Sequence, residues 1–318
     1  PDAYDTGLAV SAIANAVAIG PLVGATANFF IEFESRMNAP ERVLEFKEVD
    51  QERAYEIEAT KPPAEWPAHG KIEFKDLTIA YKPGVPVLHG LTASIKAMEK
   101  IGIVGRTGAG KSTLITALFR TTEPASGSVE IDGVDIDQIG LFDLRRRLSI
   151  IPQVPQLFIG TVRYNLDPFG EHSDEEIWKV LDMVSLKPFV ANSLEAGLDS
   201  MVEENGGNFS VGQRQLLSMA RCLLLDSHIL LLDEATASLD VQSDAMLQRM
   251  IRQHFKQRTV LTIAHRLVTI IDCDRVMVLD KGRIVEFDSP KKLLQNQKGI
   301  FYGMVQATGK ATASHLID

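Results

Sequence analysis

A glycine-rich loop between an apolar run and a helical segment constrains this chain more than any other feature. The loop reads GRTGAGKST from Gly105 to Thr113, after the apolar run 101–104 and before a segment that favours helix, 114–120. Glycine permits backbone turns that other residues avoid, so the N–H groups of such a loop can converge on one anion. The helix adds free N–H groups and the positive end of its dipole. The order of strand, loop and helix therefore predicts a nucleotide-binding phosphate loop rather than an ordinary turn with a surface lysine.

Each position of this loop has an expected role in binding a nucleotide with Mg²⁺. Lys111 would neutralise the β- and γ-phosphates, and the Ser112 hydroxyl would hold the Mg²⁺ ion that bridges them. The other loop residues would surround the phosphates, and these are Gly105, Arg106, Thr107, Gly108, Ala109, Gly110 and Thr113.

Composition narrows the class of protein. A length of 318 residues, 45% of them hydrophobic, allows one large domain with an appendage or two modest domains. The net charge of −9 argues against a general nucleic-acid binder, whose surface is usually basic. Cys222 and Cys273 lie far apart in apolar surroundings, which favours reduced buried thiols in a cytosolic domain. Because the first residue is Pro1 and not Met, the sequence is interpreted as a fragment or a processed product.

The N-terminal segment has the length and composition of a membrane helix. No charged residue occurs at 6–31, and this length suits a helix that spans a bilayer in about 20 residues. Alanine and glycine dominate the run, which also holds Asn15 and Asn28, so a helix packed among other helices is expected. A signal peptide would need a basic start and a cleavage site, neither of which is evident, whereas a buried helix of a soluble protein stays open as an alternative.

Charge and proline content divide the rest of the chain. Residues 32–60 are highly charged, with apolar residues at helical spacing, which predicts a cytoplasmic helical extension that breaks into a linker. Residues 1–60 are therefore interpreted as the end of a membrane domain. Prolines at 61–69 predict a stiff connector to a nucleotide-binding domain at 70–308, and a loose tail is expected at 309–318.

The predicted domain alternates strands and helices, which is typical of an α/β fold with a parallel sheet. A segment at about 154–225 has mainly helix signals and is interpreted as a helical insertion. Strands are predicted at 71–81, 91–95, 128–131, 149–153, 228–232 and 259–263, and in a hairpin over 275–288. Helices are predicted at 141–148, 173–184, 209–225 and 240–255.

Polar residues at the ends of predicted strands extend the candidate site. Asp233 ends a buried strand, at the edge where open α/β sheets bind ligands, and its carboxylate would hold Mg²⁺ directly or through water. Glu234 follows and would orient or activate the water that attacks the γ-phosphate. Gln153 would reach Mg²⁺ or that water, and His265 would contact the γ-phosphate, although either residue alone carries little weight.

Together these residues resemble the nucleotide-binding domain of ATP-binding cassette (ABC) transporters, over about 70–308. Gly105–Thr113 is similar to the Walker A motif, Ile229–Glu234 to the Walker B motif, and Asn208–Gln213 to the signature motif of the family. Four further motifs occur in the family order, which excludes a chance resemblance. They are the aromatic residue that stacks on adenine, the Q-loop, the D-loop and the switch histidine, at Tyr81, Gln153, Ser238–Asp240 and His265.

The resemblance narrows to the second nucleotide-binding domain of subfamily C, which includes the multidrug resistance-associated proteins. Val211, where the broader family has glycine, is usual in this subfamily. The resemblance implies a P-loop NTPase fold with an antiparallel β subdomain and an α-helical subdomain, preceded by a long helix from the last membrane span. The segments that carry it are Ile103–Ser112, Asn165–Phe169, Phe209–Leu216 and Thr262–Leu267.

In this family two nucleotide-binding domains close head to tail around ATP. The resemblance therefore implies that Ser210, Gly212 and Gln213 face phosphates bound to a partner domain. It implies as partners the first nucleotide-binding domain and the transmembrane domains of the same transporter, in a plasma, vacuolar or vesicular membrane with this domain in the cytoplasm. The implied catalytic residues are Lys111, Gln153, Glu234 and His265, and the implied Mg²⁺ ligands are Ser112, Gln153 and Asp233.

The leading hypothesis for the function is an ATP-hydrolysing motor of an exporter of organic anions, conjugates or drugs. The main alternative is a regulatory or channel member of the same subfamily that ATP gates, and an intact Glu234 does not separate the two. A soluble cassette ATPase of DNA repair or translation is disfavoured by the charge-free N-terminal segment and the acidic balance.

Overall fold

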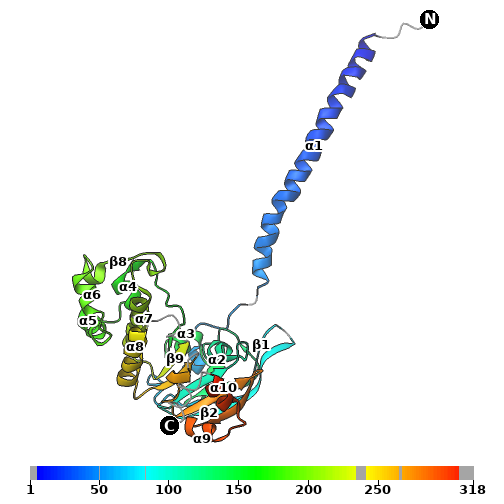
Figure 1. The fold of residues 1–318 in the computed structure, drawn as a ribbon. Helices are drawn as coiled ribbons and strands as arrows, with labels where there is room; N and C mark the ends of the chain where they lie inside the picture. The colour runs from blue at the N-terminus through cyan, green and yellow to red at the C-terminus, as the bar shows by residue number, and fades with distance from the viewer. Residues whose placement is uncertain (1–5, 50, 83, 234–240, 265–266, 308–318) are drawn as a thin grey trace. The chain divides into compact units, whose positions relative to one another are not determined.

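Two units divide the chain, with the boundary between Arg53 and Ala54. The computed structural model describes residues 6–49, 51–82, 84–233, 241–264 and 267–307 (Figure 1). The first unit consists mainly of one long helix, and the second holds the sheets and all the other helices of the described chain.

Helix α1 (Thr6–Lys47) forms the first unit and continues through Pro21 and Pro40. All its residues are exposed, including its large apolar side chains. Among the residues that the structure describes, it is the one helix long and apolar enough to cross a membrane, with a mean hydropathy of 1.8 in its most apolar window. The predicted span at 6–31 and the first part of the predicted extension therefore form one continuous helix.

The second unit begins at Ala54, whereas the sequence predicts a domain that begins at residue 70. Residues 54–69 were predicted to be the end of an extension and a stiff linker, but they pack on the domain. The Trp66 side chain is 4% exposed, and its Nε1–H donates to the carbonyl oxygen of Ile131 at 2.9 Å. Burial of this ring fixes the segment to the antiparallel sheet, so the proline-rich stretch is part of the folded unit.

Two main sheets make up the described part of this unit (Figure 1). The smaller one is antiparallel, in the order β2-β1-β4-β5, and the larger one has the order β12-β11-β3-β10-β9-β6. Neighbouring strands from β11 to β6 run parallel, and β12 is antiparallel to β11. The strands are β1 (Ile72–Lys82), β2 (Val85–Ile95), β3 (Lys100–Gly105), β4 (Pro124–Ile131), β5 (Val134–Asp135), β6 (Leu148–Ile151), β9 (Ile229–Asp233), β10 (Thr259–Ile263), β11 (Arg275–Asp280) and β12 (Arg283–Asp288).

Helices α4, α5 and α6 lie together at one end of this unit, and the antiparallel sheet lies at the other (Figure 1). Apolar residues of α4 to α8 form one core cluster, whereas the strands of the antiparallel sheet pack with β3 and α2 in another. The helices are α2 (Lys111–Leu118), α3 (Leu141–Arg145), α4 (Val162–Leu166), α5 (Asp174–Met183), α6 (Lys187–Asn192), α7 (Val211–Leu225), α8 (Val241–His254), α9 (Pro290–Gln295) and α10 (Ile300–Ala307), with the short strands β7 (Gly160–Thr161) and β8 (Met201–Val202) among them.

This arrangement confirms the predicted α/β fold with an antiparallel β part and a helical part. The strand predicted at 91–95 is longer than expected, because Val85 and Pro86 already pair with the end of β1. Helices α4, α6, α9 and α10 were not predicted, since each is short and lacks a long apolar period.

Asp132 fastens the start of the antiparallel sheet. Its carboxylate accepts hydrogen bonds from the backbone N–H groups of His69, Gly70 and Lys71, at 2.8, 3.0 and 2.7 Å. Burial alone would raise the pKa of this carboxyl, but the three N–H donors outweigh burial and hold its pKa below the ordinary value. The ionised form of Asp132 is therefore stabilised in the folded state.

We expect Asp132→Asn to lower the free energy of unfolding at pH 7, because an amide oxygen replaces a charged acceptor. Because the pKa of Asp132 is lower in the folded protein than its ordinary value of 3.8, the ionised carboxylate stabilises the fold above pH 3.8. This stabilisation is lost as the pH falls through the folded pKa. The difference from wild type should therefore be constant from pH 5 to 7 and shrink below pH 3.8. Urea unfolding followed by the fluorescence of Trp66 measures the free energy of unfolding of wild type and variant at each pH. The exposed Asp182→Asn is the control. A difference that does not vary with pH would contradict this account.

Candidate functional site

The phosphate loop joins the buried strand β3 to helix α2 and depends on its glycines. At Gly105, a Cβ atom would lie 2.4 Å from the carbonyl oxygen of Leu279 on β11. Gly108 and Gly110 have φ of +81° and +98°, where any side chain causes strain. The predicted strand, loop and helix are thus present, with glycine required at Gly105 by close packing and at Gly108 and Gly110 by backbone conformation.

The turn between β11 and β12 holds this loop in place. The Gly282 N–H donates to the carbonyl oxygen of Ala109 at 3.1 Å, and the Gly282 carbonyl accepts from the His89 N–H of β2 at 2.9 Å. A Cβ atom at Gly282, whose φ is +75°, would lie 2.0 Å from the carbonyl oxygen of Val87. From the sequence, Gly282 predicts only a hairpin turn, and its close approach to β2 depends on the tertiary fold.

Lys111 is the first residue of α2, and its ammonium group turns back over the loop. Its Nζ donates to the carbonyl oxygens of Gly105 and Arg106, at 2.9 and 3.3 Å. Both of these partners are neutral, so they leave its positive charge uncancelled. The next residue, Ser112, is exposed. A cation and a hydroxyl therefore stand side by side at the start of the helix.

A cavity of about 510 Å³ lies over the loop and the first turn of α2. This volume falls within the range of small-molecule sites. The loop and the residues from Lys111 to Thr113 form its polar side, where helix N–H groups, an ammonium and hydroxyls suit a polyphosphate with Mg²⁺. Its apolar side was not predicted, and comes from Val87, Ala264, Leu267, Met304 and Ala307.

Tyr81 stands at the end of β1, beside the same helix. Its hydroxyl lies 3.2 Å from Oγ1 of Thr113 and 3.3 Å from Oγ1 of Thr116, both on α2. The side chain is 54% exposed. The anchored hydroxyl fixes one end of the ring, and the exposed remainder of the ring is free to stack on a flat ligand.

Asp233 lies at the same edge of the sheet as the phosphate loop. Strand β10 separates β9 from β3, and its residue Ile263 pairs with Asp233 on one side and with Ile103 on the other. Two strand spacings are about 10 Å, so Asp233 is close enough to share an ion with a ligand held by the loop. Gln153 follows the next strand, β6, and is exposed beyond its end.

Ser210 begins α7 in a complete capping box. Its Oγ accepts from the Gln213 N–H at 3.2 Å, and Oε1 of Gln213 accepts from the Ser210 N–H at 2.8 Å. Ser210 is exposed, and Gly212 and Gln213 are half-buried. Within the described residues, none of these three lines the cavity over the phosphate loop. The residues predicted to contact phosphates therefore lie in two separate places, at the loop and at the start of α7.

Helix α7 is tied to the segment that contains Gln153. Its residue Gln215 donates through Nε2 to the carbonyl oxygen of Pro152 at 3.2 Å. Further along, Arg221 donates to the carbonyl oxygens of Gln156, at 2.8 Å, and of Asn165. Burial lowers the pKa of the Arg221 guanidinium. The segment after β6 is thus held by the same helix that carries Ser210 at its start.

Two predicted catalytic residues, Glu234 and His265, lie outside the described residues, as does the Ser238–Asp240 segment. Their roles stay predictions. The structure brings together the loop, Lys111, Ser112, Thr113 and Tyr81 around α2, with Asp233 at the same sheet edge.

Comparison with known proteins identifies relatives of the whole unit. The family described as "ABC transporter" matches residues 88–237. The chain is 53% identical over 284 residues to ABC transporter C family member 3 of Dictyostelium discoideum, and 52% identical over 288 residues to ATP-binding cassette sub-family C member 4 of Homo sapiens. These alignments cover 89% and 90% of this chain. The chain spans about a fifth of the length of these curated relatives, at 20% and 22%.

A solved structure supports the same relation. A bacterial Atm1-family ABC exporter with ATP bound is 32% identical to this chain, with a TM-score of 0.77 over 86% of this chain and 48% of that one. Similarity of this extent spans most of the chain. The chain therefore carries the ATP-hydrolysing domain of the ABC transporter family, and it is similar to subfamily C members over 89–90% of its length.

Proposed function

We propose that this chain is part of an ABC exporter, in which its second unit is the ATP-binding and ATP-hydrolysing motor for the efflux of organic anions, conjugates or drugs. The observation that carries the proposal is the cavity over the phosphate loop, with Lys111 and Ser112 at its polar side. The similarity to two subfamily C proteins and to a bacterial exporter supports the transport role. Helix α1 fits a membrane span, which supports a place in a plasma, vacuolar or vesicular membrane.

In this proposal Lys111 exchanges the carbonyls of Gly105 and Arg106 for the β- and γ-phosphates of ATP. The exchange is favourable because a hydrogen bond between two charged groups is stronger than one to a neutral carbonyl. Loop and helix N–H groups bind the phosphate oxygens, and Tyr81 stacks on the adenine. Bound Mg²⁺ would offset phosphate charge, and Ser112, Gln153 and Asp233 are the residues that would hold it.

Hydrolysis then needs a group that orients water towards the γ-phosphate. Glu234, directly after Asp233, has the carboxylate for this task, and His265 would bind the γ-phosphate. Gln153 would contact Mg²⁺ or the water. Its backbone neighbours are held by α7, which supports a link between this position and the signature helix.

The exposed start of α7 supports a shared site. Ser210, Gly212 and Gln213 do not line the cavity of their own chain, within the residues described. We therefore assign them to ATP bound on the first nucleotide-binding domain of the same transporter, which in turn completes the cavity described above. The transmembrane domains of that transporter are the other partners.

We expect Glu234→Gln to abolish ATP-driven transport and to leave ATP binding intact. The carboxylate acts on the transition state more than on bound ATP, so hydrolysis should fall by about 100-fold or more. Inside-out vesicles with the full-length transporter would be tested for uptake of a fluorescent organic anion, for phosphate release and for ATP binding, with the exposed Glu175→Gln as control. Unchanged hydrolysis would contradict the role of Glu234, and an ATP-gated conductance without uptake would favour the channel alternative.

Tyr81→Ala should weaken ATP binding through loss of the stacking surface. Stacking of a base on an aromatic side chain is worth about 1–3 kcal/mol, so the Kd for ATP should rise about tenfold. Tyr81→Phe keeps the ring and loses only its hydroxyl contacts with α2, so a smaller rise is expected. Inorganic triphosphate, which has no base, should bind all three proteins equally by calorimetry. If Tyr81→Ala weakened the binding of ATP and of inorganic triphosphate equally, Tyr81 would support the loop and not the base.

The chain by itself should hydrolyse ATP slowly, because the start of α7 and the cavity cannot complete one site within a single copy. Any activity should rise more than linearly with protein concentration, as two copies pair transiently. Phosphate release from the purified chain in detergent, measured over a range of concentrations, tests this. A specific rate that is independent of concentration and equal to that of the full-length transporter would refute the shared site.

A further inference from the structure

The segment 54–60, here called the strap, caps helix α3. The carbonyl oxygens of Ala54 and Tyr55 accept hydrogen bonds from the N–H groups of Leu141 and Phe142, at 3.2 and 2.9 Å. These are the first two N–H groups of α3, and such groups have no partner within a helix. The N-cap residue, Gly140, has no side chain to satisfy them. The strap therefore supplies the cap that α3 lacks.

Gly140 is the position that lets the strap approach. Its φ of −64° and ψ of 146° suit any residue, so the backbone itself does not require glycine. A Cβ atom there would lie 2.7 Å from the carbonyl oxygen of Tyr55, 2.8 Å from Cα of Glu56 and 3.0 Å from N of Ile57. All three atoms belong to the strap backbone, which cannot move aside as a flexible side chain would.

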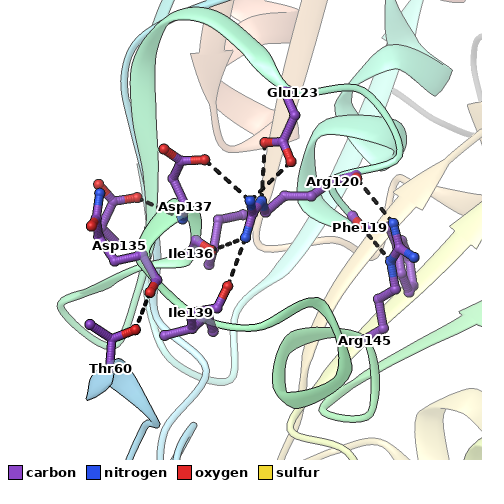
Figure 2. A network of polar contacts seen from close by, with 10 residues as sticks. Thr60, Phe119, Arg120, Glu123, Asp135, Ile136, Asp137, Ile139 and Arg145 are labelled. Carbon is purple, nitrogen blue, oxygen red and sulfur yellow. Dashed lines mark hydrogen bonds and ion pairs between the residues drawn. The ribbon is translucent and has the colours of Figure 1, made fainter. Parts of the chain in front are cut away.

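Both ends of the strap are fastened to the same stretch, 136–142, here called the seat. At one end the Tyr55 ring packs on the Phe142 ring, with centroids 5.2 Å apart. At the other end the hydroxyl of Thr60, which Figure 2 labels, donates to the carbonyl oxygen of Gln138. The strap follows directly in the chain after the unit that contains α1.

Arg120 connects the seat to the phosphate-loop helix. It lies two residues beyond the end of α2, and its side chain is 1% exposed. Its Nη1 donates to the carbonyl oxygens of Ile136 and Ile139, at 2.8 and 2.9 Å, and its Nη2 pairs with Glu123 at 2.9 Å (Figure 2). The two carbonyls flank Gln138, so one buried guanidinium holds the seat on both sides of the Thr60 contact.

Arg145 of α3 completes the connection in the opposite direction. Its guanidinium donates to the carbonyl oxygens of Phe119 and Arg120, at 3.0 and 3.1 Å (Figure 2). Separating α2 from the seat would leave the carbonyls that accept from Arg120 and Arg145 without these donors, and it would leave Nη1 of the buried Arg120 without its acceptors, which is costly. The seat must therefore follow the end of α2. That helix is only about 12 Å long, and its other end is the phosphate loop.

We propose that the strap is a nucleotide-sensitive docking contact, coupled to the phosphate loop through Gly140, Arg120 and α2. A docked strap holds α2 where its first turn binds phosphates, and nucleotide bound at that turn strengthens docking of the strap in return. The two effects are equal in free energy, as linkage requires. The inference rests on the proposed nucleotide site, and it identifies residues 54–60 as the route by which the unit containing α1 responds to that site.

The test uses Gly140→Ala in the full 318-residue chain, because the added methyl group wedges the strap from its seat without straining its own backbone. In wild type, ATP with Mg²⁺ should slow hydrogen exchange of the Leu141 and Phe142 amides. In the variant these amides should exchange faster, and the Kd for ATP should rise about fivefold. Glu56→Ala, which changes an exposed strap side chain, should alter neither quantity.

Faster amide exchange in Gly140→Ala with an unchanged Kd for ATP would overturn the coupling, and unchanged exchange would overturn the docking itself. If Gly140→Ala does not fold, Thr60→Val removes only the hydroxyl bond to Gln138 and should shift both quantities in the same directions. If the wild-type chain binds no ATP, the proposed function is wrong. If wild type and both variants bind ATP with the same Kd, only the proposed coupling through the strap is wrong.

Discussion

Close backbone approach at glycines is the constraint on which the rest of this structure depends. The phosphate loop lies against β11 at Gly105, where a Cβ atom would collide with the Leu279 carbonyl oxygen, and it is hydrogen-bonded to Gly282, where a Cβ atom would collide with the Val87 carbonyl oxygen of β2. Through Gly282 the same contact reaches β2, so the antiparallel sheet and the parallel sheet meet at the loop. Gly140 has the same function at the strap. The shape of the site is therefore set by main-chain contacts that tolerate no side chain, and the polar side chains act on that frame.

The sequence predicts the features whose causes are local. An apolar run followed by GRTGAGKST identifies β3, the loop and α2, and the apolar runs before Asp233 and His265 identify β9 and β10. Features made by distant contacts were missed. The segment 54–69 was predicted as an extension and a linker because its prolines and charges are typical of one, and the buried Trp66 was the one contrary signal. Helix α10 is too short for its period to be recognised, and its place in the wall of the cavity over the loop depends on the tertiary fold.

The phosphate loop and the start of α7, which are both predicted to contact phosphates, belong to different cores. The loop and α2 pack with the antiparallel sheet, whereas α7 packs with α4, α5 and α6. Helix α7 nevertheless reaches the strand ends, since Gln215 and Arg221 hold the segment that follows β6. A displacement of the helical part would therefore move Ser210 and Gln153 together. In the proposed shared site, these two residues would therefore respond together to the partner domain.

The apolar wall of the cavity bears on how the domain should be delimited in other proteins. The matched family region ends at residue 237, yet Ala264, Leu267, Met304 and Ala307 all come later in the chain. A truncated version that kept every recognised motif but stopped before α10 would keep the phosphate-binding chemistry and lose part of the enclosure around it. Motif content and a complete wall of the binding cavity are thus separate properties of the polypeptide, and fragment libraries or sequence searches that select for the first do not secure the second.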